Sequence, residues 1–297
     1  MTFTEGGSFE GGRVKTSRGR RGAAAGGGVG LLAIAVYVIS QLTGVDLAPV
    51  VDAVQGGTGA VAVQATEGTL GTCSAAEANS QRDCRLPATV YALDTCWAQS
   101  LPGDGFTFTR PDVYSFESTM STGRGTASSS TGPFCCPPDR TIYIDLGFYD
   151  LLQSPYGASG GSLAEMYVVA HEYGHHIQQI TGVMDQANRR GTGAESDSVK
   201  TELQADCYAG LWTGHAASTV DTTTGVTFLD PITQAELPDA LSAAQAVGDD
   251  HIQQQSGGGV NPDAWTHGSS AERQRWFMTG HTQGTLAACD TFSAPSL

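Results

Sequence analysis

The sequence predicts an α+β fold, a small sheet followed by several helices, behind one N-terminal transmembrane helix. Strand-like segments lie mainly in the first half of the chain and helical segments in the second half. An uncharged run near the N-terminus predicts the membrane helix. With 297 residues, 40% of them hydrophobic, the chain is long enough to bury one sizeable core.

Residues 23–42 carry the membrane prediction, because this uncharged stretch has about the length of a bilayer-spanning helix. Three arginines lie just before it, so the positive-inside rule makes residues 1–22 a basic cytoplasmic head and places the rest of the chain outside the cytoplasm. A cleaved signal peptide is the alternative, although the run is long for one. Residues 43–70, rich in small residues, predict a flexible tether, and residues 71–297 the globular domain.

The charge of the chain bears on its partners. It has 30 acidic and 15 basic residues, a formal net charge of −15. Five basic and two acidic residues lie before position 23, so the part from residue 43 onward holds ten basic and 28 acidic residues. Such a body repels phosphate backbones, and no nucleic-acid partner is expected.

Within the domain, the elements are predicted from apolar spacing and from helix start and stop signals. The first half contains a helix over 86–100, an extended segment over 106–116, a polar loop over 123–132 and a strand over 141–146. The second half contains helices over 162–180, 196–213, 233–255 and 269–279. Pro87 suits a first helical turn, and Ser269 with Glu272 has the spacing of a capping box.

All seven cysteines lie beyond the predicted membrane segment. This placement predicts an oxidising compartment and up to three disulfides, with one thiol left over. No pair has the CxxC spacing, so a zinc site built of thiolates is not expected. Cys135 and Cys136 are adjacent, and a bond between neighbours is strained, so each pairs elsewhere or one stays free.

The clearest chemical motif is His171-Glu172-Tyr173-Gly174-His175, an HExxH sequence inside the predicted helix 162–180. Residues four apart on a helix share a face, so the two imidazoles can bind one zinc ion. Glu172 then lies beside the metal, where it can take a proton from a water molecule. The alternative for such a motif by itself is a surface helix with solvated histidines.

A third ligand is expected because catalytic zinc takes three protein ligands and one water. The metzincin extension would need glycine at 178 and histidine at 181, but Gln178 and Thr181 stand there. The next predicted helix offers Glu202 as a ligand, and Asp206 one turn later can accept the second ring N–H of a zinc histidine. The alternative is an ordinary acidic face. Against it, the surrounding helix is apolar, and two carboxylates there would need a cationic partner.

Five segments carry a resemblance to a known family: GPFCCPPDRTIYIDLGFYDLL, AHEYGHHIQ, ELQADCYAGLW, AVGDDHIQ and THGSSAERQRWF. They resemble the bacterial putative neutral zinc metallopeptidase family. The resemblance implies a zincin-like domain of the gluzincin arrangement, with one Zn²⁺ per chain held by His171, His175 and Glu202 and with Glu172 as general base. Cys135 departs from the aromatic residue expected there, and Cys136 is expected to pair with Cys207.

The predicted function is zinc-dependent hydrolysis of peptide bonds in peptide or protein substrates of the cell envelope. His267 is the candidate donor to the developing oxyanion, with His251 and Tyr208 as other candidates. The strand over 141–146 is expected beside the metal helix, with an edge that could hold a substrate peptide. Two alternatives are a zinc-bearing scaffold that does not cleave and a zinc hydrolase of a non-peptide envelope polymer.

Overall fold

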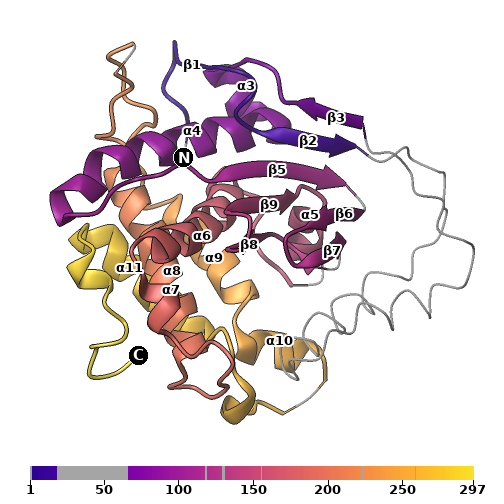
Figure 1. The fold of residues 1–297 in the computed structure, drawn as a ribbon, viewed down its shortest axis with the longest axis vertical. Coiled ribbons are helices and arrows are strands. Elements are labelled where there is room, and N and C mark those ends of the chain that lie inside the picture. The colour runs from indigo at the N-terminus through magenta and orange to yellow at the C-terminus, as the bar shows by residue number, and fades with distance from the viewer. Residues whose placement is uncertain are drawn as a thin grey trace, which may run out of the picture.

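The structure is a computed structural model. It describes residues 2–18, 66–117, 119–128, 131–154, 156–222, 224–257 and 259–297. A mixed sheet and the helices packed around it form the domain (Figure 1), so the α+β prediction is confirmed. The predicted membrane helix, residues 23–42, and most of the predicted tether lie outside the described residues. Within these ranges no helix combines the length and the apolar character needed to cross a bilayer.

The main sheet has the strand order β3-β2-β5-β9-β8 in the described part of the chain. Strands β2, β5 and β9 run parallel, while β3 and β8 are antiparallel to their neighbours. The strand bounds are β2 Lys15–Arg18, β3 Thr66–Thr69, β5 Asp112–Glu117, β8 Phe134–Cys136 and β9 Thr141–Asp145. The predicted strand over 141–146 is therefore present as β9, but both of its sides are paired, so the free edge expected there is wrong.

Residues 2–18, here called the N-terminal arm, are part of this domain. β1 (Ser8–Phe9) pairs with β4 (Cys73–Ser74), and β2 lies between β3 and β5 (Figure 1). Phe3, Phe9 and Val14 are buried in the core. The sequence predicted a head and a tether separate from the domain. In the structure the arm pairs with β3, which lies in the predicted tether, and with β4 and β5, which lie in the predicted domain.

The helices surround the sheet and carry most of the core. Their bounds are α3 Ala75–Ser80, α4 Arg82–Ser100, α5 Phe148–Gln153, α6 Ser162–Ile180, α7 Val183–Gln186, α8 Asp197–His215, α9 Leu237–Ala246, α10 Asp249–Gln255 and α11 Ser270–Gln283. Short 3₁₀ turns cover Leu101–Asp104, Pro262–Ala264 and Ala287–Cys289. The helix over 162–180 is found with its predicted bounds, and the predicted capping box of Ser269 with Glu272 starts α11.

Three predicted elements differ from the structure. The helix expected over 233–255 is broken into α9 and α10 at Gly248, where a Cβ atom would lie 2.6 Å from the backbone nitrogen of Ser270. Helix α4 starts at Arg82, so Pro87 lies inside it rather than in its first turn. The polar loop over 123–132 contains half of a hairpin, β6 (Thr119–Thr122) with β7 (Gly125–Ser128).

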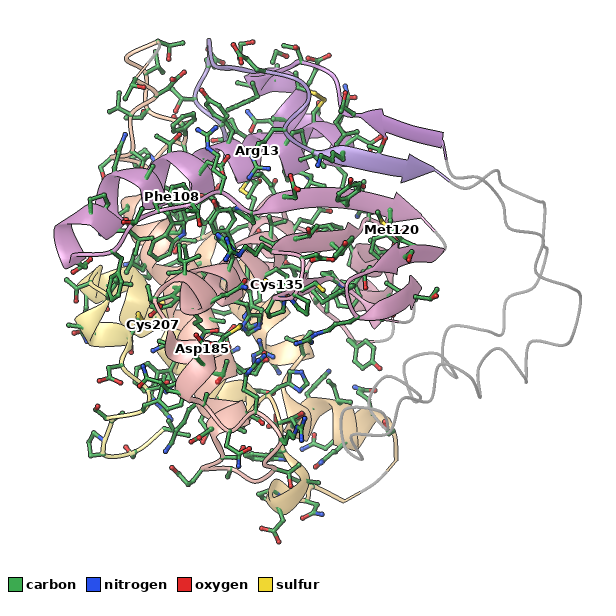
Figure 2. All side chains as sticks on the ribbon, in the orientation of Figure 1. Arg13, Phe108, Met120, Cys135, Asp185 and Cys207 are labelled. Atoms are coloured by element: carbon green, nitrogen blue, oxygen red, sulfur yellow. A yellow bond between two sulfur atoms is a disulfide. The ribbon has the colours of Figure 1, made fainter. Side chains whose placement is uncertain are left out.

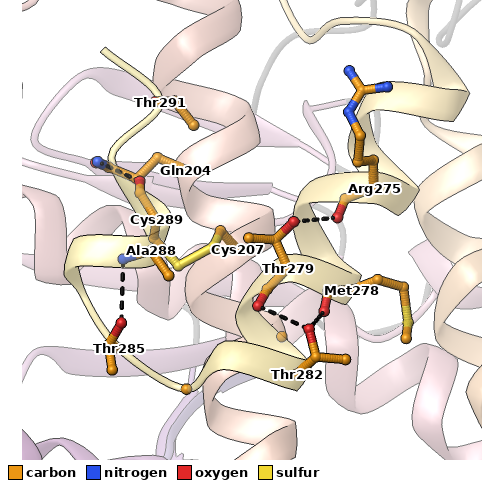
Figure 3. Close-up of a disulfide and its surroundings, with 12 residues drawn as sticks. Gln204, Cys207, Arg275, Met278, Thr279, Thr282, Thr285, Ala288, Cys289 and Thr291 are labelled. Atoms are coloured by element: carbon orange, nitrogen blue, oxygen red, sulfur yellow. Dashed lines mark hydrogen bonds between the residues drawn. A yellow bond between two sulfur atoms is a disulfide. The ribbon is translucent and has the colours of Figure 1, made fainter. Parts of the chain in front are cut away.

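Two disulfides are formed, Cys73–Cys84 and Cys207–Cys289, while Cys96, Cys135 and Cys136 are free and buried. The expected Cys136–Cys207 pair is wrong. Cys136 lies on β8, in a small cluster with aromatic residues of the sheet. Cys207 instead lies on the side of α8 that packs against α11 and the last 3₁₀ turn (Figure 3).

Removing the Cys207–Cys289 bond is expected to destabilise the domain more than removing Cys73–Cys84. The two bonds join residues 82 and 11 positions apart. In the chain-entropy description these loops correspond to about 4.5 and about 2.8 kcal/mol in the free energy of unfolding. Denaturant unfolding of two double cysteine-to-alanine variants measures the difference. Equal losses would contradict this order.

Candidate metal centre

Helix α6 brings the HExxH residues together. His171 and His175 lie one turn apart on its buried face, with ring centroids 4.8 Å from each other. Gly174, between them, allows close packing: a Cβ atom there would lie 3.0 Å from the carbonyl oxygen of Ala205 on α8. On α8, Ala205 directly precedes Asp206 and lies three residues after Glu202. The close contact of Gly174 with Ala205 therefore brings α6 and α8 together at the level of these two carboxylates.

Glu202 of α8 completes a three-residue group. Its Oε2 lies 3.2 Å from His171 Nε2, and its Oε1 lies 3.4 Å from His175 Nε2. The three potential ligand atoms all lie within 4.8 Å of one another. Two imidazole nitrogens and a carboxylate are the donor set of a catalytic zinc site that keeps one position for water.

Each histidine ring is oriented through its other nitrogen. His171 Nδ1 donates to Asp206 Oδ1 at 2.8 Å, and His175 Nδ1 donates to Gln178 Oε1 at 2.8 Å. Gln178 is itself held, donating to the Thr201 carbonyl oxygen at 2.7 Å. These contacts fix the tautomer that leaves both Nε2 atoms free to accept a metal. The role of Asp206 was predicted from the sequence, whereas Gln178 was noted there only because the metzincin motif would have glycine at its position.

The buried carboxylate of Asp206 has a cationic partner that the sequence analysis did not identify. Arg273 of α11 donates from Nε to Asp206 Oδ2 at 2.8 Å and from NH2 to Oδ1 at 3.0 Å. Tyr167 of α6 donates its hydroxyl to the same carboxylate. Burial alone would raise the pKa of Asp206, but Arg273 and His171 lower it below its ordinary value. The sequence did indicate that a cation was needed, because two carboxylates lie on an apolar helix, but it did not indicate which residue would supply it.

The electrostatics of the group favour a bound cation. Burial by itself would lower the pKa of His171, but Asp206 and Glu202 raise it to about 10. Burial would likewise raise the pKa of Glu202, but His175 and His171 lower it well below its ordinary value. Both shifts arise because the imidazoles and the carboxylates lie close together, so without a metal a proton is held between His171 and Glu202, and a metal ion bound by these groups would replace that proton.

Glu172 projects from α6 next to His171. Glu172 is 9% exposed. None of the described residues donates a hydrogen bond to its carboxylate or forms an ion pair with it. The charge of Glu172 is one of the causes, after burial, that raise the pKa of the Cys135 thiol on β8. Glu172 is thus within electrostatic reach of strand β8 and next to His171 in the sequence, where its carboxylate can act on a water molecule.

The three candidate oxyanion donors lie in different places. The backbone N–H groups of residues 266–268 all donate to Asp249 Oδ2, and His267 Nδ1 lies 3.3 Å from Asp249 Oδ1. Glu202 and Asp249 both raise the pKa of His267 against the effect of burial, so His267 lies within electrostatic reach of the metal ligands. Tyr208 packs instead against Trp97, and His251 contacts the Tyr156 carbonyl oxygen.

The family of this chain is shown by its similarity to known proteins. A family model described as "putative neutral zinc metallopeptidase" matches residues 4–292. The chain belongs to this family. The match begins inside the N-terminal arm and extends beyond α11, so it includes the arm, all three potential metal ligands and Arg273.

Relatives of this zinc metallopeptidase family member occur in Mycobacterium and Escherichia. An uncharacterized protein of Mycobacterium tuberculosis (strain H37Rv) is 49% identical over 222 residues, which cover 75% of this chain and 74% of the relative. The uncharacterized protein YpfJ of Escherichia coli K12 is 38% identical over 269 residues, covering 89% of this chain and 86% of YpfJ. No solved structure matches. The family supports a zinc peptidase, and the relatives' names add no substrate.

Proposed function

We propose that this protein is a zinc-dependent peptidase that hydrolyses peptide bonds in proteins of the cell envelope. The observation that carries the proposal is the convergence of His171, His175 and Glu202, with Glu172 next to His171 on the same helix and without a partner for its carboxylate among the described residues. One helix supplies the two histidines and a later helix the glutamate, which is the gluzincin form of a zincin-like domain. Zinc held by these groups supplies Lewis-acid chemistry, which acidifies water and polarises a carbonyl group.

The protein's own residues transfer the proton, stabilise the oxyanion and orient the metal ligands. Glu172 takes a proton from the attacking water and passes it to the leaving amine nitrogen. His267, whose Nδ1 lies 2.9 Å from the Thr266 hydroxyl and 3.3 Å from Asp249 Oδ1, is the residue we assign to the developing oxyanion, through its other ring nitrogen. Asp206 and Gln178 keep the two histidine rings in their orientation.

Strand β8 is the place we assign to the substrate backbone. It is the last strand of the sheet in the described residues, and it packs against α6. A peptide added to β8 would extend the sheet beside the metal ligands. Cys135, labelled near the middle of the molecule in Figure 2, lies on this strand.

The disulfides support a site of action outside the cytoplasm. Two bonds, Cys73–Cys84 and Cys207–Cys289, lie in the domain that holds the metal group. Disulfides of this kind persist in oxidising compartments and are rare in the bacterial cytoplasm. Attachment to the membrane through residues 23–42 stays a prediction.

The proposal is tested by incubating the full chain, loaded with zinc, with an unbiased peptide mixture and mapping the cuts by mass spectrometry. We expect cuts that disappear when a chelator removes the metal and return when zinc is restored. A folded, zinc-loaded protein that cuts no peptide would contradict the proposal. Digestion of purified cell-wall fragments would then indicate a non-peptide polymer, and binding of envelope proteins without cleavage a scaffold.

A further inference from the structure

The N-terminal arm fills an interior position of the fold rather than an outer one. β2 lies between β3 and β5, with Thr16 opposite Gly68 on one side and opposite Ser115 on the other. Among the described strands, β3 has no neighbour except β2. Figure 1 shows the indigo β2 lying between the purple strands β3 and β5. Without the arm, β3 would lose its place in the sheet and β5 would become an edge.

The arm is also buried by its side chains. Phe3 and Val14 are 1% and 0% exposed, and Phe9 stacks on Phe228 with ring centroids 6.4 Å apart. The arm's first residues also pair with the segment before α9: Phe3 forms a β-bridge with Leu229, and the Thr4 backbone nitrogen donates to the Phe228 carbonyl oxygen at 3.0 Å. Contacts of this kind bury apolar surface as a domain core does.

Arg13 links the arm to the metal helix. Its guanidinium donates to both oxygens of Asp94 on α4, at 2.6 and 2.9 Å, and to the Pro111 carbonyl oxygen at 2.8 Å. Asp94 is fully buried and accepts the hydroxyl of Tyr173 at 2.7 Å. Tyr173 follows Glu172 on α6. Arg13 lies beside α4 in Figure 2. Arg110 also approaches Asp94, with its Nε 3.4 Å from Asp94 Oδ2, but its side chain is largely exposed, whereas that of Arg13 is largely buried and makes the shorter contacts. An arm residue is therefore the closer of two cations at the carboxylate that accepts the Tyr173 hydroxyl.

We propose that the N-terminal arm shares one compartment with the metal site and that Arg13 is a positioning residue for the metal helix, acting through Asp94 and Tyr173. The pairing of Arg18 with Thr66 places the two ends of the segment 19–65 side by side. A single membrane crossing by residues 23–42 would leave these two ends on opposite faces of the bilayer. The strand pairing and the predicted cytoplasmic head therefore exclude each other, and the structure favours the pairing.

The compartment is tested by a cross-link in intact cells. A Cβ atom at Gly68 would lie 3.0 Å from Thr16 Oγ1, so Thr16→Cys with Gly68→Cys has the spacing of a disulfide. Cells producing the full chain are treated with diamide, thiols are blocked with N-ethylmaleimide before lysis, and peptide mapping locates the bond. Thr16→Cys with Thr69→Cys is the matched control, because neighbouring strand residues point to opposite faces.

We expect the bond between positions 16 and 68 in most of the protein and little bond in the control. A parallel sample of cells receives a membrane-impermeant maleimide in place of N-ethylmaleimide, which crosses membranes. Absence of the bond in folded protein, together with labelling of the position-16 thiol by the impermeant reagent only after the cell membrane is opened, would place the arm in the cytoplasm and overturn the proposal. This test is independent of the proposed peptidase activity.

The role of Arg13 is tested on purified full-length protein by zinc titration well below the unfolding temperature. This readout rests on zinc being the cofactor proposed above. We expect Arg13→Ala to weaken zinc binding by about twofold to thirtyfold, and Arg13→Lys or the added Asp94→Asn to restore most of it. Lys15→Ala, which removes an exposed ion pair with Asp112, is the control. Unchanged zinc affinity in folded Arg13→Ala would show that Arg13 serves stability alone.

Discussion

Glu172→Gln is expected to reduce kcat for peptide hydrolysis by about 10²- to 10⁴-fold, the range of a general base. The amide keeps the shape of the side chain but cannot take a proton from water. None of the described residues pairs with the Glu172 carboxylate, so the folded state loses no described contact. Zinc content and melting temperature should therefore stay close to those of the unaltered protein.

Glu165→Gln is the matched control on the same helix. Glu165 is also buried, but its carboxylate pairs with Arg82 at 2.8 Å and Arg85 at 2.5 Å. This substitution should lower stability and leave kcat nearly unchanged. Steady-state kinetics and thermal melts on both variants separate the two roles. Hydrolysis by zinc-loaded Glu172→Gln at the original rate would exclude Glu172 as the base.

Local patterns predicted much of the site because its residues repeat at helical spacing. His171 and His175, and Glu202 and Asp206, are pairs four residues apart, and the structure brings these two pairs to one place. Two helices with clear caps and apolar faces carry them, and α6 has its predicted bounds. These patterns lie within single helices of 19 residues, so they can be recognised without knowing which distant segments come into contact.

Distant contacts were missed for the same reason. Arg273 lies far along the chain from Asp206, and nothing in its local sequence distinguishes it from Arg275. The Cys207–Cys289 pairing depends on how α11 crosses α8, which spacing does not reveal. Gly248 breaks the helix expected over 233–255 because α11 starts against it.

The N-terminal arm shows how composition can leave a strand unrecognised. β2 has the sequence Lys-Thr-Ser-Arg, without the apolar alternation that marks a strand. Its basic residues precede an apolar run, a combination typical of a cytoplasmic flank. In the structure another basic residue of the arm, Arg13, which precedes β2, lies inside the domain, where it pairs with the buried Asp94 together with Arg110.

Arg273→Met is expected to destabilise the domain and weaken its metal site together. It leaves Asp206, which is fully buried, without the cation that forms two hydrogen bonds with it. Breaking a buried ion pair by removing one partner costs about 3–5 kcal/mol in the free energy of unfolding. Methionine has a similar length, so the loss reflects charge more than volume.

The metal site should respond because Asp206 also orients His171. Without Arg273, Asp206 is driven toward its protonated form, which holds the His171 Nδ1–H less strongly. Disturbing such a partner of a zinc ligand weakens binding by about 10- to 100-fold. Denaturant unfolding and competitive zinc titration measure the two effects. A variant with unchanged stability and zinc affinity would contradict the assigned role.

Two further variants separate charge from packing. Adding Asp206→Asn to Arg273→Met removes the uncompensated charge, so stability should partly return while zinc affinity stays low, because the neutral amide orients His171 less well. Arg275→Met, on the same helix, removes an exposed side chain that donates to the Leu297 carbonyl oxygen, so it should cost about 0.5–1.5 kcal/mol, well below the cost of Arg273→Met. Because Arg273 and Asp206 touch, their effects on stability should be non-additive. If Asp206→Asn partly restores the stability lost in Arg273→Met, α11 supports the metal centre through the charge of Arg273. If the two losses simply add, it does so through packing.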